Sequence, residues 1–359
     1  KMRKKIVGML TTATLLTMAL AGNVQAAEIR SVGPDGEAAV DASTIELTDD
    51  QIAQIKEGGY TAAICLHYGG NDWSTSQQKG LEDTFGELGI EIVAVTDANF
   101  SAETQVSNIE TVMAKKPDIL VSIPTDATAT ADAYKQAAAA GIKIVFMDQR
   151  ANGLEAGKDY VSVVSADNYG NGYASGTVLG DALGGKGKVA MVYYDANFAP
   201  TNQRDEGFRD AMKNYPDIEI VTEQGFTDES GCAEQGDAIL TQFPNIDGIY
   251  ASWDVPMEGV LSAVRAAGME GKVTLACNDL GNNVAREIAS GNIAGGGAQM
   301  PYDQGVAEAK LAALALLGEE TPSYVAVPAE TVTHENVLEA YTDVYHVETP
   351  DWLKEAYVE

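Results

Sequence analysis

Carboxylate, amide and aromatic side chains follow directly after several short apolar segments of this sequence. Two of the three tryptophans, Trp73 and Trp253, stand in such places, each beside an aspartate. Indole rings pack against the flat faces of small molecules, while Asp, Asn and Gln hydrogen-bond to hydroxyl groups. The combination favours non-covalent binding of a polyhydroxylated small molecule. The residues with this placement are His67, Asn71, Asp72, Trp73, Asp148, Gln149, Trp253, Asp254, Asp279 and Gln299.

The segments that must position these residues alternate between two patterns. Short apolar runs bounded by Gly, Pro or Asp predict strands, and longer segments with apolar residues at helical spacing predict helices. Strands are expected to begin near Ala62, Ile90, Ile119, Ile142, Val161, Val189, Ile218, Ile249, Val273 and Ile293. After a short helix that opens with a capping box at Thr48, helices are expected over 76–88, 102–115, 128–140, 171–183, 202–213, 231–242, 257–267, 282–289 and 303–317.

This alternation predicts an α/β fold. Strands connected by helices form parallel sheets covered on both faces, and ligands bind at the carboxyl ends of such strands. The strands fall into two runs, up to about residue 165 and from about 166 to 297, and 359 residues suit two domains of average size. The helix at 303–317 would return to the first lobe, so the lobes would be joined by a hinge of two or three crossings.

Charge and composition exclude several classes of protein. The chain has 53 acidic and 23 basic residues, a formal net charge of -30, so a nucleic-acid backbone would be repelled. Three His and three Cys leave little for a metal centre, an iron–sulfur cluster or a disulfide scaffold, and no cofactor is expected. Cys65 and Cys277 lie in apolar runs and are expected to be buried, unreactive thiols.

The first 26 residues have the pattern of a secretory signal peptide. Four basic residues within 1–5 precede an uncharged apolar stretch at 6–22, and small residues suited to cleavage follow, up to Ala26. The stretch is short for a membrane anchor. We therefore expect a secreted or periplasmic protein, cleaved near Ala26.

From about residue 60 to residue 328, roughly three quarters of the sequence, the chain resembles the periplasmic sugar-binding proteins of the ribose-binding type. These proteins are the substrate receptors of ABC importers. The resemblance rests on the order and spacing of short motifs. They are Lys79-Gly80-Leu81-Glu82, Ala138-Ala139-Ala140-Gly141-Ile142, Ser165-Ala166-Asp167-Asn168, Leu183-Gly184-Gly185-Lys186-Gly187-Lys188-Val189, Arg204-Asp205-Glu206-Gly207-Phe208 and Ala298-Gln299-Met300-Pro301-Tyr302-Asp303-Gln304-Gly305.

The resemblance implies roles for several of the strand-end residues. Asp148 and Asp279 match the family's two sugar-binding carboxylates, and Gln299 matches its hinge-side glutamine. Asn71 matches a polar ligand contact, and Trp73 stands where the family has a stacking Phe.

Other family positions are occupied differently in this chain. The family's sugar-binding Arg falls at Asn202 and its second binding Arg at Gln149, while the Asn opposite its stacking aromatics falls at Trp253. His67 replaces a smaller polar residue. A site without both cations is expected to bind something other than ribose. A neutral sugar or polyol fits two uncompensated carboxylates, a cationic amine or a nucleoside is also compatible, and an anion is disfavoured.

The resulting prediction is an exported solute-binding protein that closes two doubly wound parallel-sheet lobes over a small sugar or polyol and delivers it to an ABC permease. We expect a monomer without catalytic activity. The three-segment hinge, near 165–167, 299–300 and 327–329, is of the type I periplasmic binding protein kind. The expected divisions are a signal peptide at 1–26, a loosely held leader and short helix at 27–59, an N-terminal lobe of 60–165 plus 300–328, and a C-terminal lobe and tail of 166–299 plus 329–359.

Three alternatives stay open at this stage. The same binding module could serve as a receptor for chemotaxis or for a sensor kinase. Paired carboxylates could also belong to an exported carbohydrate-active enzyme. A ligand-sensing repressor of the related lactose-repressor type would need an N-terminal helix-turn-helix and a basic face, where this sequence has the pattern of a signal peptide.

Overall fold

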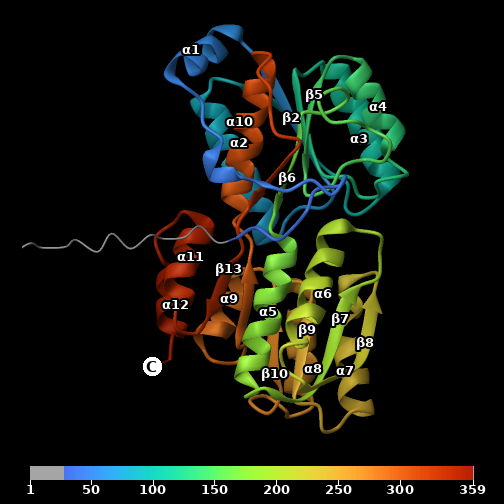
Figure 1. Ribbon diagram of the computed structural model, residues 1–359, viewed down its shortest axis with the longest axis vertical. Helices are drawn as coiled ribbons and strands as arrows, with labels where there is room; N and C mark the ends of the chain where they lie inside the picture. Colours follow the sequence, from blue (N-terminus) through green and yellow to red (C-terminus); the bar gives the residue numbers. More distant parts are fainter. Residues whose placement is uncertain (1–27, 359) are drawn as a thin grey trace, which may run out of the picture.

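The computed structural model describes residues 28–358, so the expected signal peptide lies outside the described residues. Two sheets, each covered by helices, lie one above the other (Figure 1). The elements of the first lobe are β1 (Val40–Asp41), α1 (Asp49–Gly58), β2 (Thr61–Leu66), α2 (Asp72–Glu87), β3 (Glu91–Asp97), α3 (Ala102–Lys115), β4 (Ile119–Ser122), α4 (Ala131–Ala139), β5 (Lys143–Met147), β6 (Ser162–Ala166), α10 (Pro301–Leu316) and β12 (Tyr324–Val327).

The second lobe is formed by the middle of the chain and its C-terminal segment. Its elements are α5 (Asn168–Ala182), β7 (Lys186–Tyr194), α6 (Ala199–Met212), β8 (Asp217–Phe226), the 3-10 turn η2 (Glu229–Gly231), α7 (Cys232–Gln242), β9 (Gly248–Ala251), α8 (Asp254–Ala266), β10 (Thr274–Cys277), α9 (Asn282–Ala289), β11 (Gly295–Ala298), β13 (Glu330–Thr333), α11 (Val337–Tyr345) and α12 (Asp351–Ala356). None of the helices in 28–358 is both long enough and apolar enough to span a bilayer.

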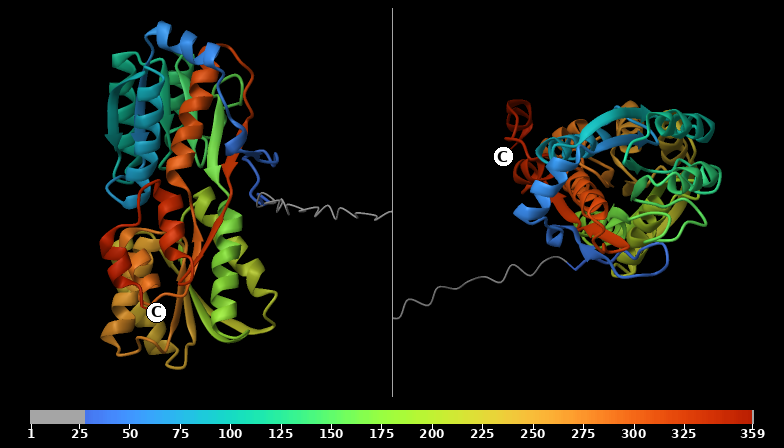
Figure 2. Two further views of the ribbon diagram at one scale, coloured as in Figure 1. Left: turned by 90° about the vertical axis from the view of Figure 1, so that its left-hand side faces the viewer. Right: turned by 90° about the horizontal axis from the view of Figure 1, so that it is seen from above.

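The strand order places the chain crossings at the hinge. The first sheet has the order β1-β12-β6-β5-β4-β2-β3 and is parallel, and the second has the order β13-β11-β10-β9-β7-β8, parallel except for the β11–β13 pair. The chain passes between the lobes from β6 to α5, from β11 to α10 and from β12 to β13, as the left view of Figure 2 shows. The expected α/β fold of two parallel-sheet lobes is confirmed.

Several helices begin earlier than their apolar pattern predicts, because capping side chains start them in polar sequence. Asn71 accepts a hydrogen bond from the Ser74 backbone, so α2 begins at Asp72 rather than at residue 76. Asp167 caps α5 in the same way. Polar residues that follow the strands therefore stand at the starts of the next helices, as Asn71 and Asp167 do.

The segment before the first helix is firmly bound, and the expectation of a loosely held leader is wrong. Val40 and Asp41 pair with β12 as an edge strand of the first sheet. Ser31 is buried, and its backbone N–H and its hydroxyl both donate to the hinge residue Asp167, each over 2.8 Å. The local sequence is polar and rich in turn residues, and these distant partners fix it against the first sheet and the hinge.

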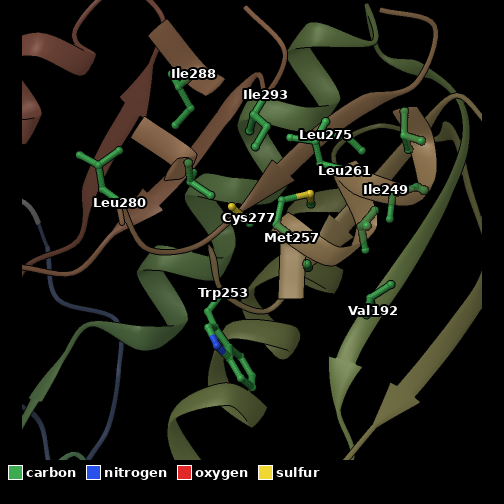
Figure 3. Close-up of a cluster of buried hydrophobic side chains, with 14 of the residues drawn as sticks. Val192, Ile249, Trp253, Met257, Leu261, Leu275, Cys277, Leu280, Ile288 and Ile293 are labelled. Carbon is green, nitrogen blue, oxygen red and sulfur yellow. The ribbon is translucent and has the colours of Figure 1, made fainter. Parts of the chain in front are cut away.

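Apolar cores fill both faces of each sheet. In the second lobe the larger core packs α7, α8 and α9 against the sheet, and Figure 3 shows Trp253 at the edge of this core, away from the other labelled side chains. All three cysteines are buried and free, which confirms the expectation for Cys65 and Cys277.

Candidate functional site

A pocket between the lobes gathers side chains from the ends of strands in both sheets. It encloses about 490 Å³ of empty space, counting its opening to solvent. Its lining residues are His67, Tyr68, Asn71, Trp73, Phe100, Ile123, Asp148, Tyr194, Phe198, Pro200, Thr201, Arg204, Trp253, Asp254, Asp279 and Gln299. Eight of the eleven residues expected from the sequence are therefore brought together here.

Three expected residues lie outside this pocket. Asp72 is at the rim, where its carboxylate accepts hydrogen bonds from the backbone and side chain of Asn282 in the other lobe, over 2.8 and 2.9 Å. Gln149 is turned away and binds backbone groups, donating to Pro124 and accepting from Ala199. Asn202 is exposed on α6. Asp72 and Gln149 thus contribute to contacts around the pocket rather than to its lining.

The sequence expectation that the site lacks both cations is also wrong, because Arg204 lines the pocket. In α6 the residues Thr201, Arg204 and Phe208 share the buried face, and Asn202 falls on the opposite side of the helix. The guanidinium donates to Asn168, to the Ser252 carbonyl and to Asp279, with the last contact at 3.1 Å. A shift of two residues along a helix therefore decides whether a cation reaches the site.

Asp148 follows β5 and is held by side chains of the hinge. Its Oδ1 accepts hydrogen bonds from the Ser165 hydroxyl at 2.9 Å and from Gln304 Nε2 at 3.3 Å. The Ala166 backbone also hydrogen-bonds to this carboxylate. Burial raises the pKa of Asp148 to about 6, although the hydrogen bond from Ser165 and the nearby Arg204 lower it.

Asp279 follows β10 and is the counterpart of Asp148 in the second lobe. It accepts from Arg204 and, at its other oxygen, from Gln299 Nε2 over 2.8 Å. Asp148 and Asp279 both adopt left-handed backbone conformations, with φ of 54° and 69°. Aspartate tolerates this conformation better than most residues, and such local strain is often found at functional sites.

The two carboxylates are joined by one chain of hydrogen bonds that runs through the hinge. Ser165 donates to Asp148, Asn168 Nδ2 donates to Ser165 over 2.9 Å, and Arg204 Nε donates to Asn168 over 2.9 Å. Arg204 then contacts Asp279. Because Ser165 and Asn168 flank the β6–α5 crossing, the site and the hinge form a single polar network.

A second acidic group lies on the wall formed by Trp253. The indole N–H donates to Glu229 Oε1 over 2.8 Å, and the Tyr68 hydroxyl of the first lobe donates to the same oxygen over 3.4 Å. Beside them, Asp254 accepts from the Gly281 backbone at 2.9 Å. Burial and the neighbouring Asp279 raise the pKa of Asp254 well above its usual range.

The opposite wall is a cluster of aromatic rings around His67. Its imidazole packs edge-on against Tyr68, Trp73 and Phe100, and it stacks on Phe198 of the second lobe at 5.6 Å between ring centres. Burial lowers the pKa of His67 to about 3, so the ring is neutral. This stacking contact and the contact between Asp72 and Asn282 show that the lobes are closed on each other.

Sequence reasoning missed half of the pocket lining. The missed residues are Tyr68, Phe100, Ile123, Tyr194, Phe198, Pro200, Thr201 and Arg204. Tyr68 stands beside His67 in the first loop and could have been included. Tyr194 and Phe198 follow a strand, as the expected residues do, but a lone aromatic residue in a loop carries no pattern of its own.

No group of three or more His, Cys, Asp or Glu within 28–358 is arranged to hold a metal ion. The arrangement can instead hydrogen-bond a ligand from several sides and stack against it. Residues 62–320, well over half of the chain, match the periplasmic binding protein domain. The chain belongs to the periplasmic binding protein family.

Individual relatives of this periplasmic binding protein agree in fold and in length. The D-ribose/D-allose-binding protein of Pseudomonas aeruginosa is 29% identical over 273 residues, which cover 73% of this chain and 83% of the relative. An ABC transporter periplasmic solute binding protein from Actinobacillus succinogenes, solved with bound D-allose, is 29% identical with a TM-score of 0.72 and covers 77% of this chain and 99% of its own. An Agrobacterium vitis solute binding protein bound with alpha-D-tagatopyranose is 26% identical with a TM-score of 0.74. The match covers 81% of this chain and 100% of that protein's chain. The resemblance to the ribose-binding type is confirmed.

Proposed function

We propose that this periplasmic binding protein is exported, captures a small neutral sugar or polyol between its lobes, and delivers it to an ABC permease. The observation that carries the proposal is the pocket that joins Asp148, Arg204 and Asp279 to aromatic walls from both lobes. The relatives with bound D-allose and tagatopyranose support a ligand of this class. The signal-peptide pattern at 1–26 supports export.

The charges around the pocket favour a neutral ligand with many hydroxyl groups. Asp148, Asp254, Asp279 and Glu229 face a single guanidinium, that of Arg204. An anion would meet this excess of carboxyl groups, whereas a hydroxyl can donate to a carboxylate such as that of Asp148. Each charge-assisted hydrogen bond contributes roughly 1.5 to 3 kcal/mol. A few of them, together with ring stacking, reach the roughly -8 kcal/mol of micromolar binding.

The proposed mechanism is lobe closure without chemistry. A ligand that contacts both lobes binds the closed form better than the open form and so shifts the population toward closure. The contact between Asp72 and Asn282 and the stacking of His67 on Phe198 exist only when the lobes meet. The closed form is then the state offered to the permease, through the hinge motion common to two-lobed binders.

A binding screen tests this function. The protein without residues 1–26 is titrated calorimetrically with D-ribose, D-allose, D-tagatose, myo-inositol, adenosine and choline. We expect one of the neutral sugars or polyols to bind with micromolar affinity or better and to be recovered chemically unchanged. Binding of adenosine or choline alone would contradict the proposed ligand class, and conversion of the sugar would contradict a role in binding only.

Two variants separate pocket residues from surface residues. Asp148→Asn removes a carboxylate from the pocket and should abolish the heat of binding. Asn202→Ala alters an exposed position on α6 and should leave it unchanged. Equal losses in both variants would show that the ligand lies elsewhere.

A further inference from the structure

A buried polar cluster beneath the pocket has no role in the function described so far. Gln77 of α2 and Gln304 and Glu308 of α10 are completely buried where these two helices pack in the first lobe. Gln77 Nε2 donates to Glu308 Oε1 over 2.6 Å. Gln304 Nε2 donates to Asp148 Oδ1. The cluster therefore hydrogen-bonds to the ligand site through Gln304.

The hydrogen bonds in this cluster do not balance if Glu308 is ionised. Three oxygens have no donor within 28–358, namely Gln77 Oε1, Gln304 Oε1 and Glu308 Oε2. A carboxylate and two amide oxygens are acceptors only, and a buried acceptor without a donor is costly. A proton on Glu308 Oε2 turns one of the three acceptors into a donor, which can satisfy a second.

Helix geometry makes Gln304 Oε1 the natural acceptor of a hydrogen bond from that protonated oxygen. Gln304 and Glu308 are four residues apart on α10, so their side chains lie side by side on one helix face. If the Glu308 hydroxyl donates to Gln304 Oε1, the amide is oriented with its NH₂ group toward Asp148. If Glu308 were ionised, the amide would turn its NH₂ group toward Glu308 and present its oxygen to Asp148.

The second orientation would require a proton on Asp148, because two oxygens cannot hydrogen-bond without one. The orientation of the Gln304 amide therefore couples the protonation states of the two carboxyl groups. A proton on Glu308 leaves Asp148 ionised and supplied with a donor, and a proton on Asp148 does the reverse.

Among residues 28–358, no cation lies close enough to Glu308 to act as its counter-ion. Among the ionisable groups on the elements packed against α10, Asp148 is buried and repels a negative charge on Glu308. The remaining charged residues on α1, α2, β5 and α11 are exposed or half-buried. They are Asp49, Asp50, Lys56, Glu57, Asp72, Lys79, Glu82, Asp83, Glu87, Lys143, Glu339 and Asp343. Tyr324 of β12 and Tyr341 and Tyr345 of α11 are neutral phenols, whose pKa values burial raises. On α10 itself, Asp303 and Lys310 are half-buried.

We propose that Glu308 is a neutral carboxylic acid that orients Gln304 toward Asp148 and thereby keeps this ligand-binding carboxylate ionised. Glu308 is a positioning residue, since it acts on Asp148 only through Gln304. The part of the proposal that concerns the ligand rests on the proposed function, whereas the protonation of Glu308 does not. Burial, together with Asp148, raises the pKa of Glu308 well above its usual range, in agreement with the hydrogen-bond count.

The protonation is tested without any ligand. Urea unfolding is measured between pH 6 and pH 8 for the wild type and for Glu308→Gln, whose amide keeps an acceptor and a donor but cannot titrate. A carboxyl group that is neutral in the folded protein and ionised in the unfolded chain destabilises the folded protein as the pH rises. This loss begins above the pKa of the group in the unfolded chain, about 4.3. We expect the wild-type unfolding constant to rise up to tenfold more per pH unit than that of the variant. Parallel pH profiles would overturn the proposal.

An infrared measurement covers the case in which Glu308→Gln does not fold. In wild-type protein with isotope-labelled glutamate, the spectrum at pH 8 should contain the carbonyl band of a protonated glutamic acid. Its absence would overturn the proposal.

The link to Asp148 is tested with D-allose as the probe. Gln304→Met removes the donor and should weaken D-allose binding at pH 7 by roughly tenfold or more. Gln78→Met changes an amide on the outer side of α2 and should leave binding unchanged, while Glu308→Gln should retain most of it. Equal affinity in Gln304→Met and Gln78→Met would refute the link. If no sugar binds but the pH profiles still diverge, the proposed function fails and the neutral Glu308 stands.

Discussion

Asp279→Asn should strongly destabilise the ligand-free protein as well as weaken binding, because it takes the counter-ion from a buried guanidinium. The Arg204 and Asp279 side chains are only 6% and 9% exposed, with 3.1 Å between Nη1 and Oδ2. Removing one partner of a buried ion pair costs about 3 to 5 kcal/mol. Asp148 also attracts Arg204, which places the expected loss of unfolding free energy near the lower end, at about 3 kcal/mol.

Asparagine is the informative replacement at this position. It keeps the shape of the side chain and tolerates the left-handed backbone at φ 69°, whereas alanine would add about 1 to 2 kcal/mol of backbone strain. The assay is urea unfolding at pH 7 without sugar.

An exposed ion pair provides the matched control for this experiment. Glu223→Gln breaks the 2.6 Å contact with Arg209, in which both side chains are 37% exposed, and should cost less than about 1 kcal/mol. If Asp279→Asn were no more destabilising than Glu223→Gln, Arg204 would not depend on Asp279, and the account of the site as a network built on this pair would be wrong.

Two further predictions concern single pocket residues. Trp253→Phe should remove most of any fluorescence change on sugar binding, and Trp352→Phe, on the distant α12, should not; a change that survives in Trp253→Phe and disappears in Trp73→Phe would contradict this placement of the second-lobe wall. His67 is neutral when folded but gains a proton below about pH 6.5 when unfolded, so it should lower the unfolding free energy by about 1.4 kcal/mol per pH unit as the pH falls from 6.5 toward 3. In urea unfolding of the ligand-free protein between pH 7 and pH 5, His67→Gln should lack this slope, and an unchanged slope would show that another group titrates.

The sequence predicted the fold well because its main features are local. The period of the apolar residues distinguishes strand from helix, and strict alternation of the two implies parallel sheets. The expected helices at 102–115 and 282–289 agree with α3 and α9 at both ends. Where boundaries differ, as at the start of α2, a polar first turn stabilised by a cap had no apolar pattern to reveal it.

The pocket was predicted only where its residues stand at strand ends. Asp148 and Asp279 could be found because each directly follows an apolar strand, and carboxyl ends of parallel strands meet at one edge of a sheet. Arg204 could not be placed in this way, since it lies in the second turn of α6, and its access to the pocket depends on where that helix begins.

The sequence by itself therefore determined the order of the elements, the two-lobed α/β fold and the acidic strand ends, because each depends on residues close together in the chain. The tertiary structure decided which side chains meet. It turned Gln149 away from the pocket, brought Arg204 to Asp279, and brought Gln304 to Asp148. These contacts depend on helix phase, on closure of the lobes and on the exclusion of water from buried polar groups, none of which has a local signature in the sequence.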